Sequence, residues 1–227
     1  MIFVKLPLIL INFKTYLEAT GKNAVKLAKI CEEVAKQYNV NIAVAPAIHD
    51  LTEVISEVNI PVFSQHIDPI ERNGKHTGHI LAENVKRIGV VGTLLNHSER
   101  RLSLLEIEEC VKIAKRFDLI TVCCSENTEQ AKEIAKFSPD FIAIEPPELI
   151  GTGIPVSKAK PEVVRDTVRI INEINPGIKV LCGAGISSGE DVKKALELGT
   201  VGVLVASKVV KAKDPRAVLE DMAKAVV

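Results

Sequence analysis

The sequence predicts an α/β protein built as a (β/α)8 barrel, with eight parallel strands each followed by a helix, in one domain that covers residues 1–227. Short apolar runs rich in β-branched residues alternate with amphipathic stretches along the whole chain, which is typical of a parallel sheet covered by helices. Eight such units fit into the 227 residues without a linker or a low-complexity tract. The turn after the first strand lacks the glycine fingerprint of a dinucleotide site, so a closed barrel is favoured over an open doubly wound sheet.

Each expected strand is a short apolar run that ends at polar or turn-forming residues. The first lies in the apolar N-terminal segment, which is too short to span a bilayer and lacks the cleavage pattern of a signal peptide, so we assign it to the barrel. The expected strands are residues 6–13, 41–45, 61–65, 92–96, 119–124, 141–145, 179–183 and 201–206.

The segments between these strands have apolar residues at helical spacing and carry signals for helix starts. Ser103 and Thr128 are expected to cap the fourth and fifth helices. Pro161 stands in the first turn of the sixth, where its missing N–H breaks no hydrogen bond. The expected helices are 22–38, one from Asp50, 81–88, one from Ser103 through Phe117, then one each from Thr128, Pro161 and Ser188, and 214–227.

Composition limits the classes of partner. Basic and acidic residues balance at 29 each. A neutral chain has no electrostatic reason to bind nucleic acid or an anionic membrane, so neither partner is expected. The five cysteines are odd in number, scattered and without a Cys-x-x-Cys spacing. They are expected to be reduced thiols, which indicates a cytoplasmic protein.

The most informative segment is residues 145–153, Glu-Pro-Pro-Glu-Leu-Ile-Gly-Thr-Gly, directly after a buried strand. Two prolines stiffen the start of this loop, and Gly151 and Gly153 give its end conformational freedom. Proton-transfer chemistry under a lid requires an ionisable group such as Glu145 beside a segment able to close. The alternative is an ordinary strand-to-helix connection with a surface glutamate.

Other polar and small residues stand at the expected strand ends, where barrel enzymes hold their catalytic groups. The first strand ends at Asn12 and Lys14, the fourth at His97 and Glu99, and the sixth at Glu145. Small residues after the last two strands would let backbone N–H groups approach a phosphate. Taken singly, these are also consistent with a solvated lysine, a structural histidine and an ordinary glycine turn. The small-residue loops are Gly183-Ala184-Gly185 and Ala206-Ser207.

No metal site and no cofactor are expected. His76 and His79 have the spacing of a ligand pair, but no carboxylate or cysteine cluster stands beside them, which favours a structural role. His66 and Asp68 resemble the rim ligands of a metal-dependent epimerase. No further histidine or aspartate stands at the other strand ends to complete that site.

The same residues resemble the triosephosphate isomerase family, whose members are (β/α)8, or TIM, barrels. The resemblance runs from Asn12 to about residue 210 and follows the family's order. It covers Asn-x-Lys at the first strand, Asn-His-Ser-Glu-Arg-Arg at residues 96–101 and the loop string from Glu145. Lesser matches are Thr77-Gly78 and the pair Cys123 and Glu126.

The sequence departs from bacterial and eukaryotic relatives in ways that resemble the compact archaeal branch. Residues 147–149 replace an apolar tip that contains tryptophan, Gly185 replaces a serine, and Ala206-Ser207 replaces Gly-Gly. The chain is also shorter than the usual form. Members of the archaeal branch tend to be tetramers built from dimers, so the resemblance implies a homo-oligomer, with a tetramer favoured over a dimer.

The resemblance implies a role for each residue in interconverting dihydroxyacetone phosphate and glyceraldehyde 3-phosphate, a step of glycolysis and gluconeogenesis, through an enediolate. Following the family's established assignments, Glu145 is the base and neutral His97 donates to the substrate oxygens. Lys14 supplies positive charge, and Asn12 orients groups beside it. No cofactor is implied, because no electrons leave the substrate. Backbone amides near Ile150, Gly151, Gly185, Ala206 and Ser207 are expected to hold the phosphate of a small phosphorylated triose.

Two residues keep supporting roles in this hypothesis. Glu99 is either a participant in proton transfer or a structural partner of Lys14, and the structural role is favoured. Thr77 is expected to reach the active site of a neighbouring subunit. The rival interpretations are another phosphate-binding barrel, such as a pentose-phosphate epimerase or an amino-acid pathway isomerase, and a catalytically silent barrel that acts as a scaffold.

Overall fold

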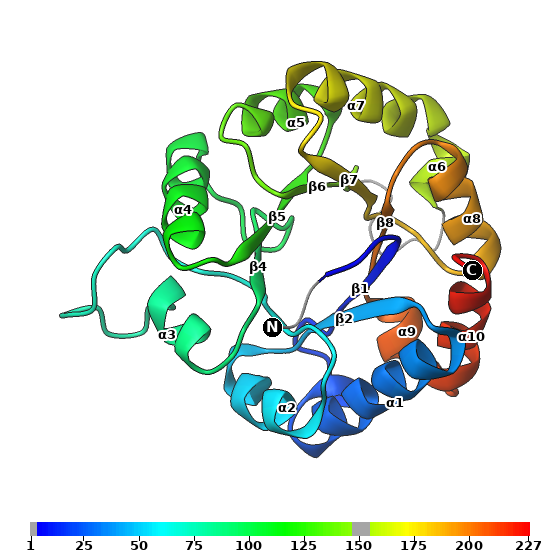
Figure 1. Cartoon of the computed structure of the whole chain (residues 1–227), viewed down its shortest axis with the longest axis horizontal. Helices are drawn as coiled ribbons and strands as arrows, with labels where there is room; N and C mark the ends of the chain where they lie inside the picture. The colour runs from blue at the N-terminus through cyan, green and yellow to red at the C-terminus, as the bar shows by residue number, and fades with distance from the viewer. Residues whose placement is uncertain (1–3, 147–154) are drawn as a thin grey trace.

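The structure, a computed structural model, describes residues 4–146 and 155–227 and has the predicted barrel architecture (Figure 1). Eight parallel strands form one sheet in the order β2-β1-β8-β7-β6-β5-β4-β3. A parallel bridge between Val44 and Val62 joins the two ends of this order, so the sheet closes on itself. Helices form an outer ring around it (Figure 1).

Seven of the eight strands lie within the runs expected from the sequence, and β5 extends one residue beyond its run, to Ser125. The third strand is shorter than expected, because only two of its residues form a ladder with β4 and its pairing with β2 is the single bridge at Val62. The strands are β1 Leu8–Asn12, β2 Asn41–Ala45, β3 Phe63–Ser64, β4 Gly92–Leu95, β5 Ile120–Ser125, β6 Phe141–Ile144, β7 Lys179–Cys182 and β8 Gly202–Val205.

The helices of the described residues also follow the expected order, with four short additions: the 3-10 helices η1 and η2 and the helices α6 and α9. Ser103 caps α4 through a capping box, as predicted. The predicted cap at Thr128 is wrong: Asn127 is the N-cap of α5 and its side chain accepts the Gln130 N–H. Thr128 is instead the first helical residue, and its hydroxyl pairs with that of Thr167 at 3.0 Å. The helices are η1 Leu17–Ala19, α1 Lys22–Tyr38, η2 Ile48–Asp50, α2 Leu51–Glu57, α3 Ala82–Arg87, α4 Leu104–Arg116, α5 Thr128–Ala135, α6 Val156–Ala159, α7 Pro161–Ile174, α8 Gly189–Glu197, α9 Ser207–Val210 and α10 Pro215–Lys224.

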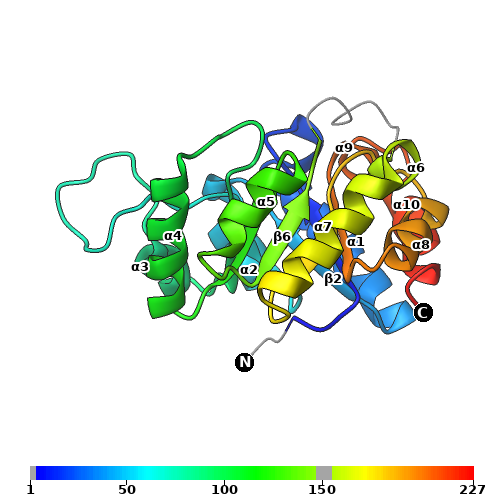
Figure 2. The same ribbon diagram turned by 90° about the horizontal axis from the view of Figure 1, so that it is seen from above.

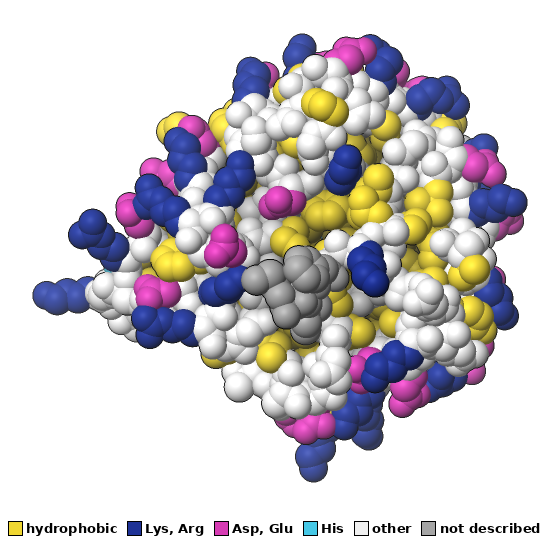
Figure 3. Space-filling model, viewed as in Figure 1, with side chains coloured by type: hydrophobic (Ala, Val, Ile, Leu, Met, Phe, Trp, Pro, Cys, Tyr) yellow, Lys and Arg dark blue, Asp and Glu magenta, His cyan; other side chains and the backbone are white. Residues whose placement is uncertain are grey.

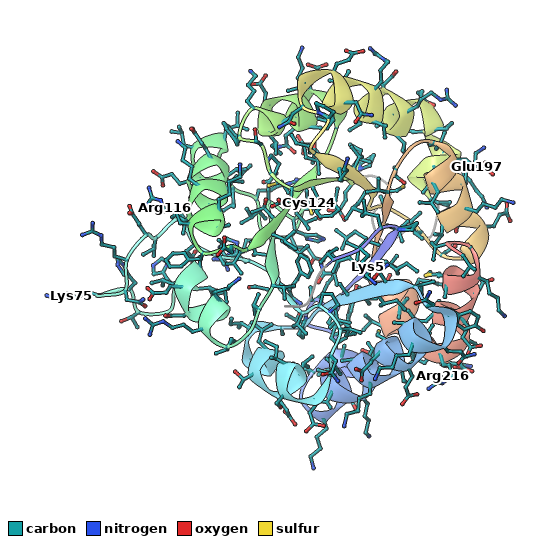
Figure 4. All side chains as sticks on the ribbon, viewed as in Figure 1. Lys5, Lys75, Arg116, Cys124, Glu197 and Arg216 are labelled. Carbon is teal, nitrogen blue, oxygen red and sulfur yellow. The ribbon has the colours of Figure 1, made fainter. Side chains whose placement is uncertain are left out.

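Alternation along each strand divides the buried side chains into two clusters. One fills the barrel and the other joins the strands to the surrounding helices. The two adjacent cysteines of β5 show the rule, because Cys123 faces the helices and Cys124 faces the barrel interior (Figure 4). All five cysteines are buried free thiols.

The segment between β3 and α3 projects away from the barrel, with Lys75 near its tip (Figures 1, 2 and 4). On the face shown in Figure 3, positive and negative side chains are interspersed around the rim, as the balanced composition indicates. None of the helices in the described part of the chain is long and apolar enough to cross a membrane.

Candidate active site

The strand ends bring most of the predicted residues to one cavity of about 400 Å³. Lys14 follows β1, His97 follows β4 and Glu145 follows β6, so residues distant in the sequence line one cavity. The remaining predicted residues that line this cavity are Asn12, Gly185, Ala206 and Ser207. The rule that parallel strands present their C-terminal ends at one rim therefore placed these residues correctly.

Glu145 is held rigidly at the end of β6. Its backbone N–H donates to the Ser125 carbonyl at 2.7 Å, and only 4% of the residue is exposed. Burial raises the pKa of its carboxyl above the ordinary value, although His97, Cys124 and Lys14 partly oppose the shift. Within the described residues its Oε2 atom has no hydrogen-bond partner. The site thus holds a carboxylate whose ionised form is poorly solvated, a property suited to a general base.

Gly183 makes room for this carboxylate. A Cβ atom at position 183 would lie 2.4 Å from Cγ of Glu145, which no real side chain tolerates. The sequence suggested only that this glycine belonged to a phosphate-binding loop. Its contact with Glu145 could not be read locally, because it depends on β7 lying beside β6.

His97 faces Glu145 across the cavity, with its Nε2 atom 3.9 Å from Oε1 of the carboxylate. The backbone N–H of Glu99 donates to Nδ1 of the ring at 3.2 Å. This contact orients the ring so that Nε2 is the nitrogen nearer to Glu145. The local turn after β4 therefore positions the ring, and its role as a neutral donor stays a prediction.

Lys14 is held by its backbone and by an ion pair. Its φ of 49° lies in the left-handed region, which a non-glycine residue adopts only when its surroundings enforce it. Its N–H donates to Asn12 Oδ1, and the Gln65 side chain donates to its carbonyl, both at 2.9 Å. Its Nζ atom lies 2.8 Å from Oε1 of Glu99. Gln65 was not predicted, and its local sequence carries no signal for this role.

Asn96, just before the histidine, also has a left-handed backbone, with a φ of 56°. Its amide donates to the Cys124 carbonyl at 2.9 Å and accepts the Leu102 N–H at 3.0 Å. Arg101 in turn donates to the Asn96 carbonyl. These contacts fix the turn that presents His97, so part of the matched string supports the site without lining the cavity.

Some predicted residues lie elsewhere. Ile150 and Gly151 are outside the described residues, as are the other positions of the segment 147–154. Thr77 is exposed on the projecting loop and does not line the cavity. Two lysines that the sequence did not single out, Lys208 and Lys211, do line it and add positive charge on the side of Ser207.

His66 and Asp68, the possible metal-ligand pair after β3, are engaged in contacts with protein groups. His66 Nε2 lies 3.1 Å from Asp68 Oδ1, and Arg100 lies 3.2 Å from the same oxygen. The second oxygen of Asp68 accepts the Ile80 N–H at 2.6 Å. Across residues 4–146 and 155–227 no group of three histidine, cysteine or acidic side chains is placed to hold a metal ion. Asp68 instead connects the two ends of the projecting loop, because it stands at the first end and accepts from Ile80 at the second.

Comparison with known proteins agrees with the geometry. A family profile described as triosephosphate isomerase matches residues 7–226. A triosephosphate isomerase of Methanothermus fervidus is 57% identical over 216 residues, 95% of this chain and 97% of the relative. One of Methanosarcina barkeri is 54% identical over 96% of this chain and 97% of the relative. These archaeal relatives accord with the archaeal branch suggested by the sequence.

A solved structure shows the same fold at much lower sequence identity. The crystal structure of triosephosphate isomerase from Bartonella henselae superposes with a TM-score of 0.77 at 18% identity, over 96% of this chain and 98% of that chain. From the family profile and the relatives together, we conclude that this chain belongs to the triosephosphate isomerase family.

Proposed function

We propose that the chain interconverts dihydroxyacetone phosphate and glyceraldehyde 3-phosphate, with Glu145, His97 and Lys14 as the catalytic residues. The observation that carries this assignment is that a buried carboxylate, an imidazole and an amine line the same cavity of about 400 Å³. Family membership supplies the reaction, and the cavity supplies a group for each step of it.

In the proposed mechanism, Glu145 removes a proton from the carbon beside the substrate carbonyl and returns it to the neighbouring carbon. The Nε2–H of His97 gives its proton to the carbonyl oxygen as negative charge develops there, and the same nitrogen takes up the proton of the neighbouring hydroxyl, so that hydroxyl and carbonyl exchange places. The Lys14 ammonium stabilises the same charge, and Asn12 holds the backbone N–H of Lys14 in place. The substrate is neither oxidised nor reduced overall, so the described residues account for the reaction without a redox cofactor.

The phosphate of the substrate is proposed to lie against the loops after β7 and β8. Gly185 has a φ of 72°, a conformation that favours glycine. Ala206 is the N-cap and Ser207 the first residue of the short helix α9, whose first N–H groups lack partners within the helix. Ile150 and Gly151 complete the proposed set from sequence alone. Lys208 and Lys211 favour an anion at this end of the cavity.

Glu99 is proposed to be structural. One of its oxygens pairs with Lys14, and its backbone N–H donates to Nδ1 of His97. Its side chain is 59% exposed, which suits an orienting partner better than a group that exchanges protons in a closed site.

A coupled assay with glyceraldehyde 3-phosphate tests the proposal directly. We expect turnover without any added metal or cofactor, and competitive inhibition by inorganic phosphate or phosphoglycolate, because both occupy the proposed anion site. Turnover without competition would refute the phosphate site. A chain with no turnover would favour the scaffold interpretation.

We also propose a homo-oligomer, with a tetramer favoured, in which Thr77 reaches a neighbouring active site. The projecting loop carries Thr77 away from its own barrel, and a second cavity of about 450 Å³ opens beside Lys14 and Gln65. If the loop of a second copy enters this cavity, specific activity must fall as the oligomer dissociates. Light scattering and activity measured over one dilution series test this, and full activity in the monomer would contradict it.

The remaining proposals concern location and partners. The five buried free thiols are compatible with a reducing cytoplasm. The balanced charge favours a small anionic substrate over nucleic acid or a membrane surface as the partner.

A further inference from the structure

A buried carboxylate outside the cavity connects two elements that border the active site. Asp191 lies in the first turn of α8, and only 1% of the residue is exposed. Its Oδ2 atom accepts from the backbone N–H of Ser187 at 3.0 Å and from the Ser187 hydroxyl at 2.8 Å. Ser187 lines the active-site cavity and Asp191 does not, so Asp191 holds the backbone of the loop after β7 from outside the cavity.

The other oxygen of this carboxylate belongs to a second contact. Lys158, on the short helix α6, places its Nζ atom 2.8 Å from Oδ1 of Asp191 and 3.3 Å from Glu190. Helices α6 and α8 lie side by side (Figures 1 and 2). One carboxylate thus joins α6, α8 and the loop after β7.

The charges of Lys158 and Asp191 are those of a stable ion pair at neutral pH. Burial raises the pKa of Asp191, but Lys158 and Ser187 lower it by more, so its pKa lies below the usual range. The carboxylates of Asp191 and Glu190 beside it raise the pKa of the Lys158 amine. Both groups are therefore charged at neutral pH, and loss of Lys158 would leave a buried negative charge without its cation.

A third contact shows that α6 is fitted to the end of β7. Cys182, the last residue of that strand, is fully buried, and burial raises its pKa to about 12 although the backbone N–H groups of Ser157 and Ala184 lower it. The backbone of Ser157, on α6, and that of Ala184, after β7, therefore lie near the same sulfur. Gly183, Gly185, Ile186 and Ser187 of this loop line the cavity.

We infer that Lys158 and Asp191 are positioning residues that hold the loop after β7 in the conformation that binds the phosphate of the substrate. The inference deepens the proposed function and rests on its phosphate site. Neither side chain lines the cavity, so both act through Ser187 and its neighbours. The pair should therefore govern the affinity for anions rather than the proton transfer at Glu145.

The test compares Lys158→Met, Asp191→Asn and the double variant. For each single variant we expect KM for glyceraldehyde 3-phosphate and Ki for inorganic phosphate to rise together by roughly tenfold, the range for coupled charged contacts. We expect kcat to stay within about threefold, because the reacting groups keep their places. The double variant should be little worse than either single one, and Lys158→Arg should restore affinity.

Matched controls separate positioning from general stability. Lys194 pairs with Glu197 on the exposed face of the same helix, at 3.4 Å, so Lys194→Met removes a similar pair without a link to the loop. Glu190→Gln removes the exposed partner of Lys158 and keeps the buried one. Both controls should retain the parent KM and Ki.

Several outcomes would overturn the inference. One is a parent-like KM and Ki in Lys158→Met, even with a lower melting temperature. Additive effects in the double variant would show that the two residues act separately. If Asp191→Asn does not fold, the KM and Ki of Lys158→Met decide the test. The side chain of Lys158 is 43% exposed, so its replacement disturbs folding less. A parent enzyme that phosphate does not inhibit would instead refute the phosphate site itself, and the inference with it.

Discussion

Replacing Glu145 with glutamine will lower turnover of glyceraldehyde 3-phosphate by at least ~10²-fold, the lower range for loss of a general base. The carboxamide has nearly the same shape as the carboxylate but cannot accept the carbon-bound proton. Because the pocket is preformed, KM should change much less than kcat. Steady-state kinetics in the coupled assay measure both, and a variant within a few-fold of the parent would remove Glu145 from its role. Glu129→Gln, on an exposed position of α5, is the control and should behave as the parent.

The pH dependence of the parent follows from the direction of the Glu145 shift. The base must be ionised to act, and burial raises its pKa, so kcat/KM should fall on the acidic side with a midpoint above the ordinary glutamate value of about 4.3. A midpoint at or below that value would contradict the buried geometry. The control Glu129→Gln should show the same acidic limb as the parent.

The same shift predicts the stability of Glu145→Gln. A pKa that is higher in the folded state means that ionisation of Glu145 disfavours folding, so at neutral pH the charged base lowers the free energy of unfolding. Glutamine removes that charge, and the inactive variant should be at least as stable as the parent at pH 7. This advantage should shrink as the pH falls through the pKa of Glu145, where the parent becomes neutral as well. Thermal melts across this pH range measure the difference.

Replacing Gly183 with alanine is expected to have the next largest effect. The new methyl group would overlap Glu145, with its Cβ 2.4 Å from Cγ and 3.0 Å from Oε1. The carboxylate must move, and displacement of a reacting group by about 1 Å can reduce the rate by ~10²-fold. We therefore expect kcat to fall by roughly that amount while the barrel remains folded.

The control for this prediction is Gly177→Ala. Gly177 lies in the turn that precedes β7, and an added Cβ would meet the Asn175 carboxamide oxygen at 3.0 Å, at the end of a side chain that can move. Its kcat should equal that of the parent. If Gly183→Ala retained parent activity, Glu145 would have to tolerate a different position, and the rigid base described above would be wrong.

The fold could be predicted because its signals are local. Apolar strands alternating with amphipathic helices indicate a parallel sheet covered by helices, eight such units favour a closed barrel, and the C-terminal ends of its strands meet at one rim. Asn12, Lys14, His97 and Glu145 were therefore placed by counting strands. The error at Thr128 arose because Asn127 and Thr128 are both able to cap, and only the backbone turn decides which one stands outside the helix.

The sequence alone thus predicted the barrel and the residues at its rim, since periodicity carries the fold, and the roles proposed for those residues came from the resemblance to the family. Only the tertiary structure decided how those groups are held. Gln65 reaches the carbonyl of Lys14, Gly183 leaves space for Glu145, and Lys158 meets Asp191 across α6 and α8. Such contacts join residues far apart in the chain, and their geometry exists only once the barrel has closed and its neighbouring strands have set the distances between loops.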